Sequence, residues 1–117
     1  MHNMASSARK YQYEKYLSAL NNHRLEEILE FHDKDCQIVF DYDTVAVGID
    51  EIQSMFVDTI SDAEYSYELV EYLPVHGDDQ IRVHLKRTDN SHMAFTYLFS
   101  KTSPQKCILV FATFLNI

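Results

Sequence analysis

The sequence predicts an α+β fold in which three N-terminal helices pack on a strongly curved, mostly antiparallel sheet. Helical spacing of apolar residues is confined to roughly the first half of the 117-residue chain. Residues 63–116 instead form long runs rich in Val, Ile, Tyr, Phe and Thr, separated by dense turn signals. Helices followed by such a meander are typical of folds in which the helices cover one face of the sheet.

The three helices are predicted from their caps and their apolar spacing. Ser6 or Ser7 can cap a first helix whose apolar residues recur at intervals of three and four: Tyr13, Tyr16, Leu17 and Leu20. A short second helix, with Asn22 as its cap, places His32 at its end. The third helix is expected over residues 49–61.

The chain has only two glycines, Gly48 and Gly77. Gly48 lies between the strand predicted over residues 36–43 and the third helix. A residue type used so sparingly is expected where the backbone needs a positive φ or a close approach.

Four further strands are predicted over residues 63–75, 79–89, 92–102 and 106–116. Their short connections indicate consecutive antiparallel hairpins. Period-two alternation directs one set of side chains toward the helices: Ile81, Val83, Leu85, Met93, Phe95, Tyr97 and Phe99.

The last strand is apolar on both faces, which indicates a central position in the sheet. Its outer face then needs a cover, and a second copy of the chain is the simplest one. We therefore expect a homodimer through the outer face of the sheet. His84 and His92 point to this outer face and are expected at the interface rather than in catalysis.

Charge and composition narrow the classes of partner. The net charge is −8 and the isoelectric point about 5, so the surface repels nucleic-acid phosphates and anionic lipids. No apolar run approaches the ~20 residues of a membrane helix, and the N-terminus lacks the apolar region of a signal peptide. We expect a cytoplasmic protein without nucleic-acid or membrane partners, with a frayed segment at residues 1–5 and one domain over residues 6–117.

No metal or cofactor is predicted. Zinc spacing, a phosphate loop and a dinucleotide fingerprint are all missing from the sequence. Cys36 and Cys107 lie in apolar strand patterns, where packed, reduced thiols are expected; a disulfide is the alternative if they lie on neighbouring strands.

The segment AVGIDEIQSMF, residues 46–56, resembles the strand–Gly–acidic–Ile–x–x–x–Phe segment of the nuclear transport factor 2-like superfamily. The preceding YEKYLSALNNHRLEEILEFHDKDCQIVF is similar to the helix–loop–helix–strand of the same superfamily. This resemblance covers nearly the whole chain and implies a cone-shaped, cystatin-like fold shared by ketosteroid isomerases, scytalone dehydratases and SnoaL-like polyketide cyclases. The motif is degenerate and indicates the fold rather than an activity.

The resemblance also implies site residues. Tyr16 falls on the oxyanion-hole tyrosine of the ketosteroid isomerases, and Tyr97 falls near their second oxyanion-hole acid. Phe40 falls where those enzymes carry the aspartate base. A phenyl ring cannot move a proton, so steroid isomerisation is not expected.

Two further residues are candidates for proton transfer. Histidine ordinarily titrates near neutral pH, so His32 is a candidate proton carrier, although a histidine at a helix end also has a structural role. Asp43, at the end of the first strand, is a candidate base. Tyr16 itself is either a hydrogen-bond donor to a ligand or a core tyrosine bonded to a backbone carbonyl or to water.

The favoured hypothesis is a small-molecule-binding, SnoaL-like protein with an apolar, aromatic-lined cavity and no clear catalytic base. The residues expected to line that cavity are Phe40, Tyr42, Met55, Phe56, Phe95, Tyr97 and Phe114. The alternative is a cofactor-independent lyase, isomerase or cyclase that acts on a small apolar oxygenated molecule and uses Tyr16 with His32 or Asp43.

Overall fold

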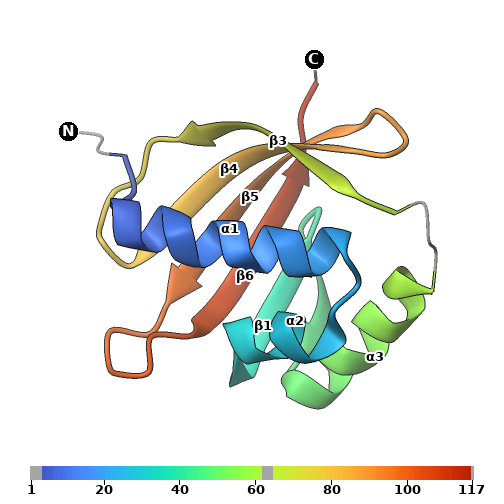
Figure 1. Ribbon diagram of the computed structural model, residues 1–117, viewed down its shortest axis with the longest axis horizontal. Helices are drawn as coiled ribbons and strands as arrows, with labels where there is room; N and C mark the ends of the chain where they lie inside the picture. The colour runs from blue at the N-terminus through green and yellow to red at the C-terminus, as the bar shows by residue number, and fades with distance from the viewer. Residues whose placement is uncertain (1–3, 62–64, 117) are drawn as a thin grey trace.

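The computed structural model describes residues 4–61 and 65–116. Within them three helices pack on one six-stranded sheet, which confirms the predicted α+β class (Figure 1). The elements are α1 (Ser7–Asn21), α2 (Leu25–Phe31), β1 (His32–Phe40), β2 (Asp43–Val47), α3 (Ile49–Ile60), β3 (Tyr67–Leu73), β4 (Gln80–Arg87), β5 (His92–Phe99) and β6 (Cys107–Phe114).

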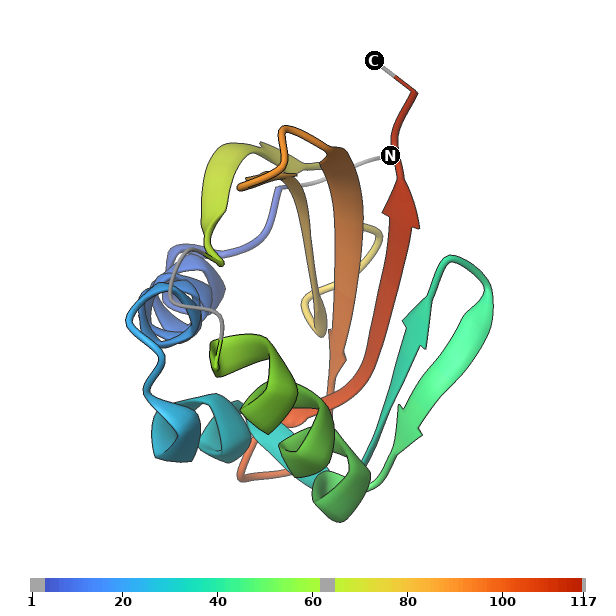
Figure 2. The ribbon, with the colours of Figure 1, turned by 90° about the vertical axis from the view of Figure 1, so that its right-hand side faces the viewer.

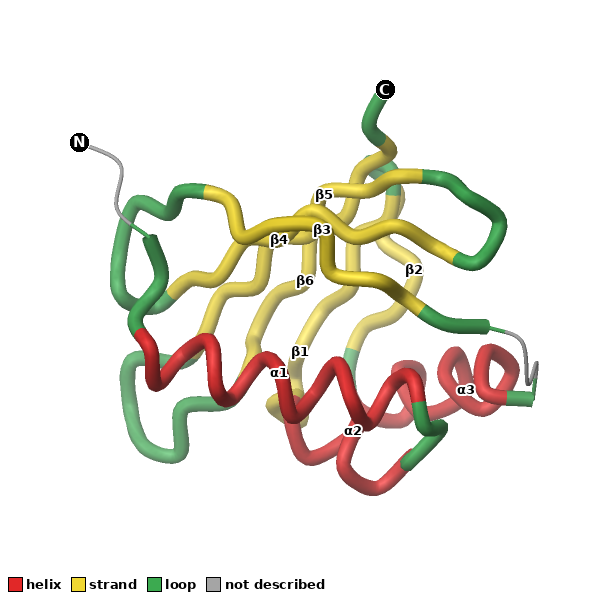
Figure 3. Tube along the Cα trace, turned by 45° about the horizontal axis from the view of Figure 1, so that its top comes forward, coloured by secondary structure: helices red, strands yellow, loops and turns green. Residues whose placement is uncertain are grey.

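The sheet has the strand order β2-β1-β6-β5-β4-β3. Neighbouring strands are antiparallel except β1 and β6, which run parallel. The sheet is strongly curved, and all three helices lie on its concave side (Figures 2 and 3). β6 is central, as its two apolar faces predicted.

The first helix begins where the sequence places it. Ser6 is the N-cap of α1, and its Oγ accepts a hydrogen bond of 3.1 Å from the backbone N–H of Arg9. The second N-cap is two residues later than expected, because Arg24 is the N-cap of α2 while Asn22 is the C-cap of α1. His23 lies between them with φ 57°, and its own conformation makes the turn.

Gly48 is the N-cap of α3 and has φ 86°, as expected for a glycine at this turn. A Cβ added here would lie 3.6 Å from the carbonyl oxygen of Lys34, which is ordinary van der Waals contact. The backbone dihedral, rather than lack of space, therefore favours glycine.

The strand expected over residues 36–43 is in fact the first half of a hairpin. The chain reverses at Asp41 and Tyr42, whose φ values are 49° and 71°, and returns as β2. Two-residue hairpin turns of this kind usually carry Asn-Gly, Asp-Gly or Gly-Gly. Asp41 fits the first position, but Tyr42 occupies the position where glycine is usual, so the reversal left only a weak signal in the sequence.

The predicted alternation of β4 and β5 is confirmed. The side chains assigned to the concave face are buried: Ile81, Val83, Leu85, Met93, Phe95, Tyr97 and Phe99. His84 and His92 lie on the outer face, where Nε2 of His84 and Nδ1 of His92 are 2.7 Å apart. The homodimer expected through this face stays a prediction.

Cys36 and Cys107 are fully buried on the neighbouring strands β1 and β6, and both are free thiols, so the disulfide alternative is not realised. Burial raises the pKa of the Cys107 thiol well above its usual value. Both behave as packed apolar side chains.

The longest helix in the described part of the chain, α1, has 15 residues, and none of the described helices is long and apolar enough to cross a membrane.

A frayed segment was expected at residues 1–5, of which residues 1–3 lie outside the described part of the chain. Ala5 already packs in the hydrophobic core with 9 % of its surface exposed.

Candidate functional site

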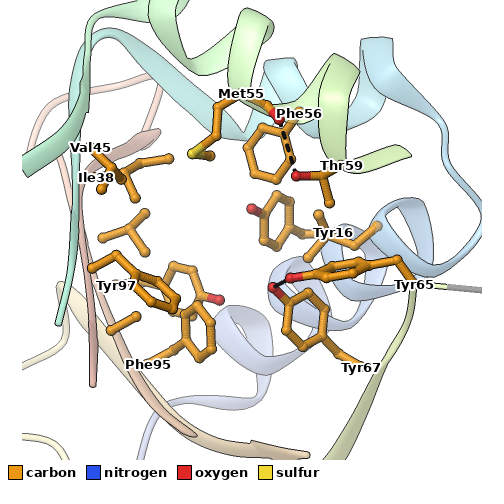
Figure 4. Close-up of a pocket in the computed structure, with 14 residues that line it drawn as sticks. Tyr16, Ile38, Val45, Met55, Phe56, Thr59, Tyr65, Tyr67, Phe95 and Tyr97 are labelled. Atoms are coloured by element: carbon orange, nitrogen blue, oxygen red, sulfur yellow. Dashed lines mark hydrogen bonds between the residues drawn. The ribbon is translucent and has the colours of Figure 1, made fainter. Parts of the chain in front are cut away.

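A cavity of about 290 Å³ lies between the helices and the concave face of the sheet (Figure 4). Every helix except α2 and every strand except β4 contributes to its wall. The lining residues are Tyr16, Leu20, Ile38, Phe40, Val45, Met55, Phe56, Thr59, Tyr65, Tyr67, Phe95, Tyr97, Val110 and Ala112. Val45 is 47 % exposed, so the cavity reaches the surface beside β2.

Most of the side chains predicted for the cavity do line it: Tyr16, Phe40, Met55, Phe56, Phe95 and Tyr97. Their roles in binding a ligand stay predictions. They meet here because α1, α3, β1 and β5 all turn one apolar face to the same interior.

Tyr42, Phe114 and Asp43 do not line the cavity. Tyr42 occupies the β1–β2 turn and is 77 % exposed, with its ring edge against Phe111 on the outer face, so its predicted inward orientation is wrong. Phe114, 44 % exposed at the end of β6, packs edge-on against Phe40 rather than into the cavity. Asp43 is exposed at the start of β2, because the hairpin turn carries it outside.

Tyr16 is held in place by α2. Its ring stacks on Phe31 with centroids 3.8 Å apart and an angle of 17° between the planes. Only 5 % of its surface is exposed, and this burial raises the pKa of its hydroxyl well above the usual value. At neutral pH Tyr16 is a protonated, rigidly placed phenol.

His32 lies behind Tyr16, where α2 passes into β1, and does not line the cavity. Its Nδ1 is 2.9 Å from the carbonyl oxygen of Ile28, and its Nε2 is 3.5 Å from Oη of Tyr16. His32 is 2 % exposed, and desolvation lowers its pKa to about 4, against the smaller opposing effect of the Ile28 carbonyl. The imidazole is therefore neutral at physiological pH.

A second pair of phenols lies deeper in the core. The hydroxyls of Tyr13 and Tyr97 are 3.3 Å apart, and their ring centroids 5.0 Å. Tyr13 is fully buried and outside the lining, whereas Tyr97 lies at the cavity wall. Tyr97 thus links the cavity to the hydrogen bonding of the core.

Sequence reasoning missed three residues that line the cavity: Tyr65, Tyr67 and Thr59. The hydroxyls of Tyr65 and Tyr67 are hydrogen-bonded to each other, and Thr59 Oγ1 donates to the carbonyl oxygen of Met55 at 3.1 Å (Figure 4). The two tyrosines are separated by one residue, a spacing that places both side chains on one face of an extended chain.

Asn21 joins this part of the cavity wall to α1. Its side-chain amide donates to the carbonyl oxygen of Tyr67 and accepts from the Tyr67 N–H, both at 2.8 Å. The side chain thereby copies the hydrogen bonding of a neighbouring strand.

Among the described residues that line the cavity, none carries a carboxylate, ammonium, guanidinium or imidazole group. Across residues 4–61 and 65–116, no three His, Cys, Asp or Glu side chains are grouped as a metal site requires. The polar atoms available to a ligand are the hydroxyls of Tyr16, Thr59, Tyr65, Tyr67 and Tyr97.

The fold has clear relatives among solved structures. A SnoaL-like protein of unknown function from Burkholderia thailandensis superposes with a TM-score of 0.81 over 97% of this chain and 100% of its own, at 12% identity. An uncharacterised protein with a cystatin-like fold from Caulobacter vibrioides gives 0.78 over 93% and 88%, at 18% identity. A nuclear transport factor 2-like protein of unknown function from Cytophaga hutchinsonii gives 0.75 over 98% and 95%, at 8% identity.

No family model matches the sequence, and no curated protein matches it either. The structural matches show that the chain has the cystatin-like α+β cone of the nuclear transport factor 2-like and SnoaL-like proteins, as the sequence predicted. At these identities the likeness describes the fold alone.

Proposed function

We propose that the protein binds a small, uncharged, largely apolar molecule in the cavity beneath its helices, without carrying out acid–base chemistry on it. The supporting observation is the composition of the wall over residues 4–61 and 65–116: its lining side chains are mostly aliphatic and aromatic, with five hydroxyls and no charged group. Apolar pockets with a few convergent polar groups are the usual form of small-molecule sites.

The size of the cavity limits the ligand. A volume of about 290 Å³ holds about ten water molecules at liquid density, so a ligand of roughly as many non-hydrogen atoms fills it. An ionised ligand would lose its hydration without gaining an opposite charge, which disfavours carboxylates, phosphates and amines.

A thermal-shift panel tests this proposal. Compact neutral alcohols, ketones and lactones are compared with carboxylates of the same carbon skeleton. A neutral ligand at a hundredfold its dissociation constant is expected to add about 2.7 kcal/mol to the free energy of unfolding. The anionic analogues are expected to have no effect.

Two alanines on adjacent strands provide a matched control. Ala112 lines the cavity, whereas Ala94, on the alternate face of β5, points outward. Ala112→Leu is expected to fill the cavity and abolish stabilisation by the ligand, while Ala94→Leu leaves it intact. Stabilisation that survives in Ala112→Leu would place the ligand elsewhere and contradict the proposal.

A lyase, isomerase or cyclase is the second candidate, supported by the 3.5 Å approach of Tyr16 to His32. This pair provides a route for a proton between the cavity wall and an imidazole. A pKa of about 4 makes His32 a weak base, and Asp43 lies outside the cavity, so binding without turnover is better supported. Exchange of α-hydrogens of a bound ketone in D₂O, followed by NMR and lost in Tyr16→Phe, would favour the enzyme.

A further inference from the structure

We infer that the cavity selects ligands that donate a hydrogen bond, namely compact alcohols and phenols, over ketones and ethers of the same shape. This inference rests on the proposed binding function and adds the class of ligand. It follows from where the protons of the wall hydroxyls go.

The proton of Tyr16 is already used inside the protein. The carbonyl oxygen of Ile28 can only accept a hydrogen bond, so Nδ1 of His32, 2.9 Å away, carries the imidazole proton. In a neutral imidazole the other nitrogen, Nε2, is then an acceptor, and Tyr16 donates to it across 3.5 Å. The phenol oxygen of Tyr16 is left with its lone pairs for a ligand.

The hydroxyl proton of Thr59 is also used inside the protein. Its Oγ1–H donates to the carbonyl oxygen of Met55 at 3.1 Å. Thr59 and Tyr16 both belong to the lining, and both offer the cavity an acceptor without a free proton.

Tyr97 is the other buried phenol at this part of the wall. Its hydroxyl is 3.3 Å from that of the fully buried Tyr13, and either oxygen can be the donor in this bond. The oxygen of Tyr97 therefore has a lone pair for a ligand, and it has a free proton only where Tyr13 is the donor. The ring centroids of Tyr16 and Tyr97 are 6.0 Å apart, so both hydroxyls belong to the same part of the cavity wall.

A ligand hydroxyl matches Tyr16, because it can donate to the phenol oxygen, and since it can also accept it matches Tyr97 whichever oxygen donates in the Tyr13–Tyr97 bond. A carbonyl oxygen can only accept. A ketone must therefore either leave the buried oxygen of Tyr16 facing an apolar group or displace the bond to His32. Both alternatives weaken its binding relative to the alcohol.

Borneol and camphor are suitable probes, because they are an alcohol and a ketone on one compact apolar skeleton with the same number of non-hydrogen atoms. Dissociation constants are measured by calorimetry on the wild-type chain. We expect borneol to bind about tenfold more tightly than camphor, the effect of one net hydrogen bond. Camphor binding as tightly as borneol, or more tightly, would overturn the inference while leaving the proposed function standing.

Variants on α1 assign the preference to one side chain. Tyr16→Phe is expected to remove the preference for borneol with little change for camphor. Tyr11→Phe, at a position 66 % exposed and outside the lining, is the matched control and is expected to keep it. A camphor affinity that falls in Tyr16→Phe would show that Tyr16 donates to the ligand, against the inference.

The proton positions can also be tested without a variant or a ligand. Nitrogen-15 NMR of the wild-type imidazoles is expected to show His32 as the neutral tautomer protonated at Nδ1. A proton on Nε2 would overturn the inference, since Tyr16 would then be free to donate. If neither probe binds at any accessible concentration, the proposed binding function fails and this inference fails with it.

Discussion

The carbonyl oxygen of Ile28 lies 2.9 Å from Nδ1 of His32, inside a region of the protein that is almost closed to solvent. Ile28 belongs to the last full turn of α2 and His32 is the first residue of β1, so this bond joins the two elements. It fixes the tautomer of the imidazole, and through that tautomer it fixes the role of Tyr16. A structural bond at a helix end thus decides what the cavity wall offers to a ligand.

His32 is expected to make the stability of the protein fall between about pH 6.5 and pH 4. Its folded-state pKa of about 4 lies below the ordinary 6.5, so in this window the unfolded chain binds a proton that the folded chain does not. Stability therefore falls as the pH falls, by about 3 kcal/mol in total for the 2.5-unit difference, and the loss is complete below pH 4. His32→Asn removes the titrating group.

Urea unfolding of the wild type and of His32→Asn at a series of pH values measures this contribution. Above pH 6.5 the imidazole is neutral in both states, so the two stability curves are expected to run parallel and serve as their own control. Below that value the wild-type curve is expected to fall more steeply. Parallel curves down to pH 4 would contradict the assignment of a buried, neutral His32.

Tyr13 and Tyr97 are expected to be energetically coupled. Tyr97→Phe leaves the fully buried hydroxyl of Tyr13 without its partner, at a cost of about 1–3 kcal/mol. Once Tyr13 is also changed to Phe no hydroxyl is stranded, so the double variant is expected to be no less stable than Tyr97→Phe alone. A cycle of unfolding free energies measures the coupling, and additivity within about 0.3 kcal/mol would count against the bond.

The sequence predicted the layers of this fold well because burial leaves a periodic record in the chain. The alternation of Ile81, Val83 and Leu85 with polar neighbours defines which face of β4 meets the helices, whatever the neighbouring strands are. Gly48 marked the turn into α3 because its positive φ excludes most other residues. These signals are local, and local signals can be read from one chain.

The parts that could not be predicted depend on contacts between distant residues or on unusual local geometry. The reversal at Asp41 and Tyr42 uses positive φ without glycine or asparagine, so Tyr42 was placed inside rather than outside. The clamp of Asn21 on Tyr67 joins positions 46 residues apart. No pattern in either segment alone announces such a pair.

Gly48→Ala is expected to destabilise the protein by about 1–2 kcal/mol, the usual cost of a left-handed conformation for a residue with a Cβ. Gly77→Ala is the matched control, since Gly48 is the glycine with positive φ. A Cβ at Gly77 would lie 3.0 Å from Oδ1 of Asp79, a side-chain atom that can move aside. Equal losses in thermal unfolding for the two variants would show that the dihedral at Gly48 is not what matters.

The homodimer predicted from the sequence has its most direct test at Phe111. This side chain lies in the middle of β6, the central strand, and pairs across the sheet with Val39 and Thr96 on the face away from the helices. Buried against a second copy, it would tolerate no charge, so Phe111→Glu is expected to convert a dimer to a monomer in sedimentation at micromolar concentration.

Val57→Glu is the control for that experiment, because Val57 is 45 % exposed on α3, the helical side of the molecule. It adds the same charge away from the sheet and is expected to leave the dimer intact. A wild-type chain that sediments as a monomer would remove the second copy as the cover of this face. Dissociation by both glutamates would instead point to net charge, already −8, rather than to a contact at Phe111.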